Sequence, residues 1–536
     1  MASATETRLV RGDTSGTRLV AAAAVGLAAL LFAVSLAALF GVVTVAGLPV
    51  RSLFGGLLLA LGGAVVAFGV GSRLGYVETE PRATAGLVAG GAFGAVWFTV
   101  GGLVASQTLG FGTVGWLAVA LVSGGGAFAV ATLTREDVGS TLPAGATALL
   151  GGLVFLGDVI GPAWVWDLGW EQQASFTAGF VVPVVTLFCA LLAGWAAAKA
   201  YGGFGARGRH VGAYLLVYIN ALSIVGVLVV LLAFTVFKGL PGLFRGVQVG
   251  LGSGPQTTLF GVTVTWPFTW PFVMEGVALM NDVNGVLPAI VGTVWLVVGS
   301  VLFAVPLGVG AAVFLTEYAE RGRFTQVVEV ATNGLWSTPS IVFGLFGYAF
   351  LIPRFGGTKS LLSGMLTLGF MLLPLVVITS REAMLAVPDE YRDASAALGV
   401  TKWQTIRSVV LPAALPGVVT GVILGVGRIA GETAPILLTM AGAPFVSGKQ
   451  TVDVVGGFQF TATPPFVSNP ALLEATSALP YQLYALITAG VGLGNNVANP
   501  EQFQWATALI LLLVVLSFYA VGIAARYYFR SNLHHE

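Results

Sequence analysis

Long apolar stretches, separated by short polar breaks, run along almost the whole chain. Each stretch has roughly the 17–25 residues that an α-helix needs to cross the hydrocarbon core of a bilayer. The period-two alternation of membrane β-barrel strands is absent. The pattern therefore predicts an all-α, polytopic membrane helical bundle. About twelve transmembrane helices are expected, near residues 19–40, 54–72, 84–105, 114–133, 143–161, 176–198, 212–236, 286–314, 328–352, 361–379, 412–440 and 506–525.

A polar break from Lys199 to His210 divides these spans into two sets of six. We expect residues 1–210 to form an N-terminal region of about six transmembrane helices, and residues 211–536 to form a second membrane domain. The first region has no charged residue deep inside a predicted span. It carries no chemistry that indicates a role.

Composition supports a membrane protein, since only 9% of residues are charged and 56% are hydrophobic, whereas soluble domains carry about 25% charged residues. With the N-terminus placed inside, most of the 24 lysines and arginines fall in inner loops, as the positive-inside rule requires. We therefore predict a multi-pass protein with both termini in the cytoplasm and with membrane lipids around it. The net charge of +1 argues against a nucleic-acid partner.

The chain lacks the residue sets that catalysis or metal binding needs. It has three histidines, His210, His534 and His535, and a single cysteine, so neither a Ser/His/Asp set nor a metal cluster is predicted. A P-loop requires GxxxxGK followed by Ser or Thr. The nearest approach, from Gly442 to Gln450, has one residue too many and ends in Gln. We predict no enzyme activity and no cofactor in this chain.

The inner loop of residues 380–412 is polar, carries charges of both signs and has an ordered pattern. Pro388 followed by two acidic residues is typical of a helix start. Gly399 permits a sharp turn, and a second short helix is expected before the chain re-enters the membrane at Pro412. A solvated loop is the simpler interpretation, but it does not require this spacing.

The spacing resembles the coupling loop of ATP-binding-cassette importer permeases, whose pattern is EAA, then Gly, then IxLP. Asp393-Ala394-Ser395 stands at EAA, Gly399 at Gly, and Val409-Val410-Leu411-Pro412 at IxLP. In that family the loop docks on an ATPase subunit. The resemblance implies that the residues of this loop couple the chain to an ATPase: Arg392, Asp393, Ala394, Ser395, Gly399, Lys402, Leu411 and Pro412.

Further motifs resemble phosphate permeases of the PstA type. They are the segment from Gly308 to Ala319, the segment from Asn333 to Gly347, Arg428-Ile-Ala-Gly-Glu432-Thr-Ala-Pro435, and Ala478-Leu-Pro480 with Tyr484. The resemblance covers roughly residues 212–527. It implies a six-helix type I ABC importer permease core in the plasma membrane of a prokaryote. It also implies four kinds of partner: a second permease (PstC-type), an ABC ATPase dimer (PstB-type) that holds ATP and Mg²⁺, an extracytoplasmic phosphate-binding protein (PstS-type), and the surrounding membrane lipids.

Arg428 and Glu432 are the candidate anion-handling pair. Four positions apart, their side chains share one helix face and can form an ion pair. Charges at bilayer depth usually pair or face a cavity, and a guanidinium matches phosphate oxygens. A purely structural ion pair is the alternative. Further candidates for the path are Thr433, Pro339, Ser340 and Asn333. For Pro339 and Ser340 a structural kink is the favoured interpretation, and Asn333 either lines the path or hydrogen-bonds a neighbouring helix.

Glu317 is expected at the inner membrane edge, paired with Arg321 or Arg323. The leading hypothesis is thus a permease subunit of an ATP-driven phosphate importer. One alternative is an ABC importer permease for another oxyanion or small solute. A less favoured one is an ion-driven secondary transporter, which leaves the 393–412 pattern without a purpose.

Overall fold

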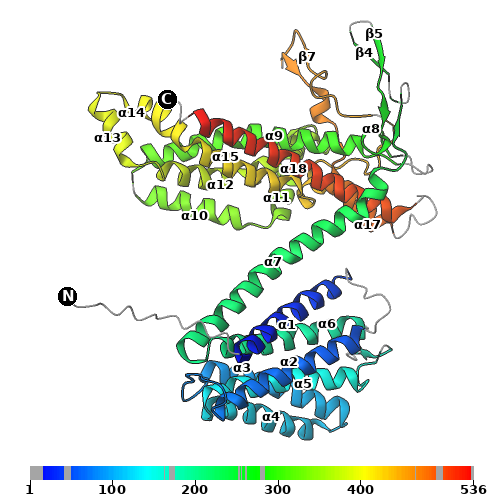
Figure 1. Ribbon diagram of the computed structural model, residues 1–536. Coiled ribbons are helices and arrows are strands. Elements are labelled where there is room, and N and C mark those ends of the chain that lie inside the picture. Colours follow the sequence, from blue (N-terminus) through cyan, green and yellow to red (C-terminus); the bar gives the residue numbers. More distant parts are fainter. Residues whose placement is uncertain are drawn as a thin grey trace. The chain divides into compact units, whose positions relative to one another are not determined.

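The computed structural model describes residues 16–41, 50–161, 163–167, 175–250, 254, 256–259, 262–277, 284–320, 322–448, 450–464, 466–490 and 499–532. The chain folds into two compact units, residues 1–232 and 233–536. The division falls inside one helix, α7 (Gly205–Leu243). Figure 1 shows the course of the chain through both units.

The first unit is built from helices that pack chiefly in the pairs α2–α5, α3–α4 and α1–α6. Between α5 and α6, a two-stranded hairpin pairs Val165 with Thr177. The core of the first unit is rich in alanine, with larger apolar side chains such as Phe54, Phe93 and Phe155 between the helices. The elements are α1 (Gly16–Leu39), α2 (Val50–Arg73), α3 (Leu87–Leu103), η1 (Val104–Thr108), α4 (Thr113–Leu133), α5 (Glu136–Leu156), β1 (Val165–Asp167), β2 (Ser175–Thr177), α6 (Ala178–Tyr201) and the first part of α7.

Glycines set the packing of α2 against α5. A Cβ atom on Gly62 would lie 2.7 Å from the carbonyl oxygen of Gly145, and one on Gly152 would lie 2.7 Å from that of Gly55. Such short contacts leave no room for a side chain. The two backbones therefore meet directly, as small residues allow in membrane helices.

Three charged side chains are nevertheless buried at helix ends in the first unit. Helix α5 begins at Glu136, earlier than the predicted 143, so Glu136 and Asp137 lie in its first turn, and both are buried. Lys199 near the end of α6 is 1% exposed and lies 2.8 Å from Glu136. The sequence places Lys199 in a polar break and the two acidic residues before a predicted span. In the folded chain, neighbouring helices bury all three side chains.

The second unit surrounds α12 with helices. Its elements are the end of α7, β3 (Gln248–Val249), β4 (Gln256–Leu259), β5 (Val262–Thr265), β6 (Phe268–Thr269), α8 (Pro271–Met274), α9 (Leu287–Val313), η2 (Phe314–Tyr318), α10 (Arg323–Ser337), α11 (Ser340–Phe346), η3 (Gly347–Leu351), η4 (Ile352–Arg354), α12 (Leu361–Leu385), α13 (Asp389–Ala397), α14 (Lys402–Thr405), η5 (Ile406–Val410), α15 (Leu411–Ala430), α16 (Ala434–Thr439), β7 (Gln459–Phe460), β8 (Val467–Ser468), η6 (Pro470–Leu473), α17 (Leu479–Gly490) and α18 (Pro500–Asn532).

Helix α12 occupies the centre of this unit, and most of its side chains are buried. It packs against α9 on one side and α15 on another. Within this unit, α13 and α14 project at one end of the helices, while the hairpins β4–β5 and β7–β8 project at the other (Figure 1). Polar elements at both ends of an apolar bundle are the arrangement that a bilayer imposes.

Two predicted spans are broken. Residues 328–352, expected as one span, form α10 and α11, which meet at an angle of 102°. Pro339 disfavours helical geometry in the residue before it, and Thr338 is extended with ψ 133°. The predicted kink at this proline is therefore confirmed. Residues 412–440 form α15 up to Ala430, then a turn, then α16.

Eleven helices in the described part of the chain are long and apolar enough to cross a membrane, or twelve if the bent pair α10–α11 counts as one span. The predicted all-α class and the predicted number of spans are confirmed. Because spans of this kind require a bilayer, the protein is a multi-pass membrane protein.

Candidate functional site

Arg428 lies in the last turn of α15. Its guanidinium carbon is 4.2 Å from the centre of the Trp336 ring on α10. Among the described residues it has no ion pair and no hydrogen bond from its side chain. A partly desolvated contact of this kind stabilises a cation by about 2 kcal/mol, and it leaves the donors of the guanidinium available.

The expected ion pair between Arg428 and Glu432 is not formed. Helix α15 ends at Ala430, and Gly431 turns the chain before Glu432 is reached. Glu432 keeps one backbone bond, from its N–H to the carbonyl of Ile429, but its carboxylate has no cation partner among the described residues. The four-residue spacing predicts a shared face only for a continuous helix, and the chain does not continue as one.

The two broken helices meet each other. A Cβ atom on Gly344 of α11 would lie 2.9 Å from the Cα of Pro435 in α16, so these short helices touch backbone to backbone. Trp336, at the end of α10, lies against the same apolar cluster as Ile429 and Ile436. The breaks at Pro339 and Gly431 therefore lie close to each other in the fold. Irregular backbone at membrane depth is tolerated where it is buried in protein or lines a cavity.

The structure brings most of the predicted path residues to this region. Pro339 caps α11 and Ser340 is its first residue, while Thr433 precedes α16 without a side-chain capping bond. Asn333 lies on α10 one turn before Trp336 and is exposed. Trp336 itself is the contact that sequence reasoning missed, because nothing in its local pattern distinguishes it from an apolar packing residue.

The inner loop folds as the pattern predicts. Helix α13 starts after Pro388, Gly399 has a left-handed φ of 72°, and α14 begins with a capping box between Thr401 and Gln404. The return into α15 passes through a π-helical turn, η5, with Pro412 in the first turn of α15. We call residues 388–405 the inner hairpin.

One predicted coupling residue faces the chain's own helices. Arg392 pairs with Glu317 of η2 at 2.9 Å and also donates to the backbone carbonyls of Met384 and Val387 at 3.0 and 2.8 Å. Glu317 was expected to pair with Arg321 or Arg323. It does not pair with Arg323, and Arg321 lies outside the described residues. The true partner is 75 positions away, so no local spacing could have indicated it.

Three large apolar side chains of the inner hairpin are exposed. Leu398 is 83% exposed, Trp403 57% and Tyr391 55%. Asp393, Ala394 and Gly399 are exposed on the same segment, whereas Ser395 is buried. Large apolar side chains at the polar end of a membrane bundle, clear of the apolar spans, are typical of a surface that another protein covers.

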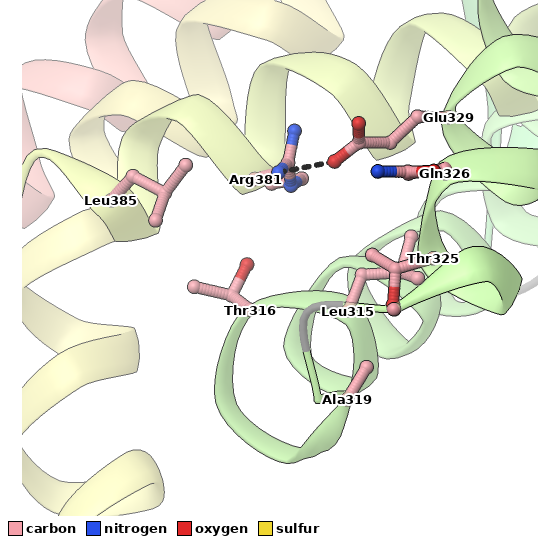
Figure 2. A pocket seen from close by; sticks show the side chains of 9 residues that line it. Leu315, Thr316, Ala319, Thr325, Gln326, Glu329, Arg381 and Leu385 are labelled. Atoms are coloured by element: carbon pink, nitrogen blue, oxygen red, sulfur yellow. Dashed lines mark ion pairs between the residues drawn. The ribbon is translucent and has the colours of Figure 1, made fainter.

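A cavity of about 360 Å³ lies beside η2, between the start of α10 and the end of α12. Figure 2 shows Arg381 and Glu329 paired across it, with the hydroxyl of Thr316 facing the same space. The ion pair measures 2.5 Å. The Nε of Arg381 and the Oγ1 of Thr316 are buried and have no hydrogen-bond partner. Both atoms belong to residues that line the cavity.

These features define a class of protein: a multi-span membrane transport subunit with a polar inner hairpin and two broken helices around a half-buried arginine. Residues 304–535 match the family model "Binding-protein-dependent transport system inner membrane component". The chain is 32% identical to the phosphate transport system permease protein PstA of Haemophilus influenzae over 255 residues, which cover 47% of this chain and 78% of the relative. The chain belongs to this family of ABC transporter permeases, and is a transport subunit and not an enzyme.

Two further comparisons give the extent of the similarity. PstA 1 of Mycobacterium tuberculosis is 33% identical over 250 residues, 46% of this chain and 72% of the relative. Among solved structures, an inward-facing form of the MetNI methionine ABC transporter covers 45% of this chain and 94% of its own, with 19% identity and a TM-score of 0.33. The family model leaves the first unit unmatched.

Proposed function

We propose that this chain is the permease subunit of an ATP-driven importer of inorganic phosphate. The observation that carries the proposal is Arg428, a cation at the meeting point of two broken helices with no anionic partner among the described residues. A guanidinium with free donors binds the oxygens of a phosphate group. The relatives that match the chain are phosphate transport permeases by name, which supports phosphate as the anion.

In this proposal Trp336 holds the Arg428 guanidinium when the path is empty. Glu432, half-buried and near the same helix break, repels the anion and keeps its binding weak enough for release. Asn333, Pro339, Ser340 and Thr433 would line the adjacent backbone breaks. Residues 211–536 would form the permease domain, with residues 1–210 as an added membrane region.

The chain would work with separate subunits. A second permease of PstC type would complete the path, and an extracytoplasmic binding protein of PstS type would deliver phosphate at the end that carries β4–β5 and β7–β8. An ATPase dimer of PstB type would bind ATP and Mg²⁺ and dock on the inner hairpin. The exposed Leu398, Trp403 and Tyr391 support this docking. In the same proposal, both termini are in the cytoplasm.

Replacing Arg428 tests the anion site. Arg428→Ala should lower phosphate uptake by about tenfold or more, since a hydrogen bond to a charged group contributes about 1.5–3 kcal/mol. Uptake of radiolabelled phosphate by cells that carry the whole transporter measures this, with sulfate and molybdate as competitors. Arg354→Ala is the matched control, because Arg354 also lies over an aromatic ring, Phe350, at 3.7 Å. Wild-type uptake by an assembled Arg428→Ala transporter would contradict the proposal, and stronger competition by sulfate or molybdate than by unlabelled phosphate would point to another oxyanion.

Replacing Leu398 tests the docking surface separately. Leu398→Asp should abolish co-purification of the ATPase, because it places a charge in a contact that excludes water. Phe460→Asp is the control, since Phe460 is equally exposed, at 83%, but lies in the hairpin at the other end of the unit. Loss of the ATPase in both variants would show general misfolding, and retention in both would remove the hairpin as the docking site.

A further inference from the structure

Arg392 is tied to three elements at once. It belongs to α13, and its guanidinium donates to the carbonyl of Met384 at the end of α12 and to that of Val387 just after α12. Two of its nitrogens contact the carboxylate of Glu317 in η2. The side chain is 22% exposed and that of Glu317 is 8% exposed. Charged donors at a helix C-terminus are favourable because they meet its free carbonyls. This arginine is therefore committed to its own chain and offers little to a docking partner.

A second contact joins the inner hairpin to the same turn. Lys402, at the start of α14, has its Nζ 5.2 Å from the centre of the Tyr318 ring. Tyr318 follows Glu317 directly in η2. The two helices of the hairpin thus hold adjacent residues of a single turn, one by an ion pair and the other by a cation–π contact.

The turn that they hold is suited to movement. η2 is π-helical and continues α9, and single π-helical turns inside α-helices are frequent at functional sites. On one side η2 has the hairpin. On the other it borders the cavity of about 360 Å³, which Leu315, Thr316 and Ala319 help to line. Space is therefore present for η2 to move toward α12.

Two unpaired polar groups beside the cavity would gain a hydrogen bond from such a movement. Thr316 Oγ1 and Arg381 Nε are both buried and unbonded in the described structure, and both residues line the cavity (Figure 2). A shift of η2 toward α12 would let the arginine N–H donate to the hydroxyl oxygen. Burying polar groups without partners costs free energy, so the closed arrangement offsets part of the cost of moving.

We propose that Arg392, through Glu317, transmits displacement of the inner hairpin to η2 and the end of α9, and that closure of the neighbouring cavity is the result. Arg392 is then a positioning residue for transport, with Lys402 and Tyr318 as the second connection. The inference rests on the proposed function in one respect, namely that a partner moves the hairpin.

The test uses the complete transporter with three variants: Glu317→Gln, Arg392→Glu, and the exchange that combines Glu317→Arg with Arg392→Glu. Three quantities are measured: ATPase co-purification, ATP hydrolysis, and phosphate taken up per ATP hydrolysed. Glu317→Gln should keep assembly and hydrolysis while phosphate uptake per ATP falls about tenfold, the factor that corresponds to about 1.4 kcal/mol. The exchange should restore it. Asp389→Asn is the matched control, because Asp389 also pairs with Arg392, at 3.1 Å, but its side chain is 90% exposed.

Amide hydrogen exchange gives a readout that does not depend on the transported solute. Trapping the transporter with ATP and vanadate should change exchange in both the inner hairpin and residues 314–318 of the wild type. In Glu317→Gln the change should stop at the hairpin. Equal changes in η2 of both proteins, or uptake per ATP unaffected by Glu317→Gln, would overturn the proposal. A transporter that shows the exchange pattern but moves no phosphate would instead overturn the proposed function.

Discussion

At the residue scale, Arg428 shows how a half-buried cation is held without an ion pair. The face of Trp336 supplies electrostatic attraction without a competing negative charge, so under the proposed function an incoming anion would not have to displace a carboxylate. A carboxylate at the same place would form a stronger pair, and the anion would then bind less readily. The aromatic partner therefore keeps the site positive and ordered.

This arrangement makes a prediction for Trp336. Trp336→Phe keeps an aromatic face and should retain most phosphate uptake, whereas Trp336→Leu removes it and should raise the concentration for half-maximal uptake severalfold, because a cation–π contact is worth about 0.5–2 kcal/mol. Concentration-dependent uptake measures this, and assembly is checked by co-purification. Equal uptake curves for the Phe and Leu variants would show that the ring serves only to fill space.

The buried charges of the first unit make a second prediction at this scale. Glu136 accepts from the backbone N–H groups of Arg82 and Gly205 and pairs with Lys199, which also donates to Ser140. Lys199→Met leaves the carboxylate buried without its cation, which typically costs about 3–5 kcal/mol. Thermal unfolding of the detergent-solubilised protein should show this loss, and the double variant with Glu136→Gln should recover much of it. Full stability of Lys199→Met would contradict this description of the pair.

The sequence could predict which residue types matter but not how they pair. Arg392 and Glu317, and Lys199 and Glu136, are each brought together by tertiary packing over many positions. Helix periodicity relates residues three or four apart and has no information on such distances. One local pairing that was predicted, Arg428 with Glu432, is absent because Gly431 ends the helix between them.

At the scale of elements, the inner hairpin was predictable because its signals are local. Proline and acidic residues mark the start of α13, a glycine ends it, and a capping box starts α14. The breaks within spans were less predictable, since hydropathy alone does not indicate a bend in an apolar segment. Pro339 marked one break, while the end of α15 at Ala430 had only a glycine to indicate it.

The left-handed backbone of Gly399 gives a testable prediction for this element. Any residue with a Cβ atom costs about 1–2 kcal/mol in that conformation, and valine is stiffer still. Gly399→Val should therefore distort the turn, with reduced ATPase co-purification and reduced uptake. Gly310→Ala is the control, because a Cβ atom there meets nothing within 4 Å. Normal co-purification with Gly399→Val would show that docking does not depend on the shape of the turn.

At the scale of the whole molecule, the chain combines a family-matched unit with one that the family model does not reach. The match covers residues 304–535, and the first unit has its own apolar core. Both the number of spans and the division near residue 210 were predicted from hydropathy. The compact units divide at Leu232, inside α7, because contacts and not polarity define them.

Removing residues 1–204 tests the role of the first unit and leaves α7 whole. If the first unit is accessory, the shortened chain should insert, bind its ATPase and take up phosphate within about twofold of the full chain, since the permease core keeps its contacts. Uptake and co-purification measured on the same preparation decide this. Loss of uptake with intact assembly would show that the first unit takes part in transport.

The glycines between α2 and α5 have a consequence for the alignment of these helices. Gly55 and Gly62 face Gly152 and Gly145, and each pair is seven positions from the other. A slide of seven residues, about 10 Å, would again bring a glycine opposite a glycine, so smooth packing alone permits more than one alignment. Ser72 on α2 donates to Asp137 on α5 at 3.0 Å, and a slipped alignment would leave that buried carboxylate without its hydroxyl. The polar cluster at the helix ends therefore fixes the register of α2 against α5. In Asp137→Ala, disulfide cross-linking between α2 and α5 should reveal the slipped form.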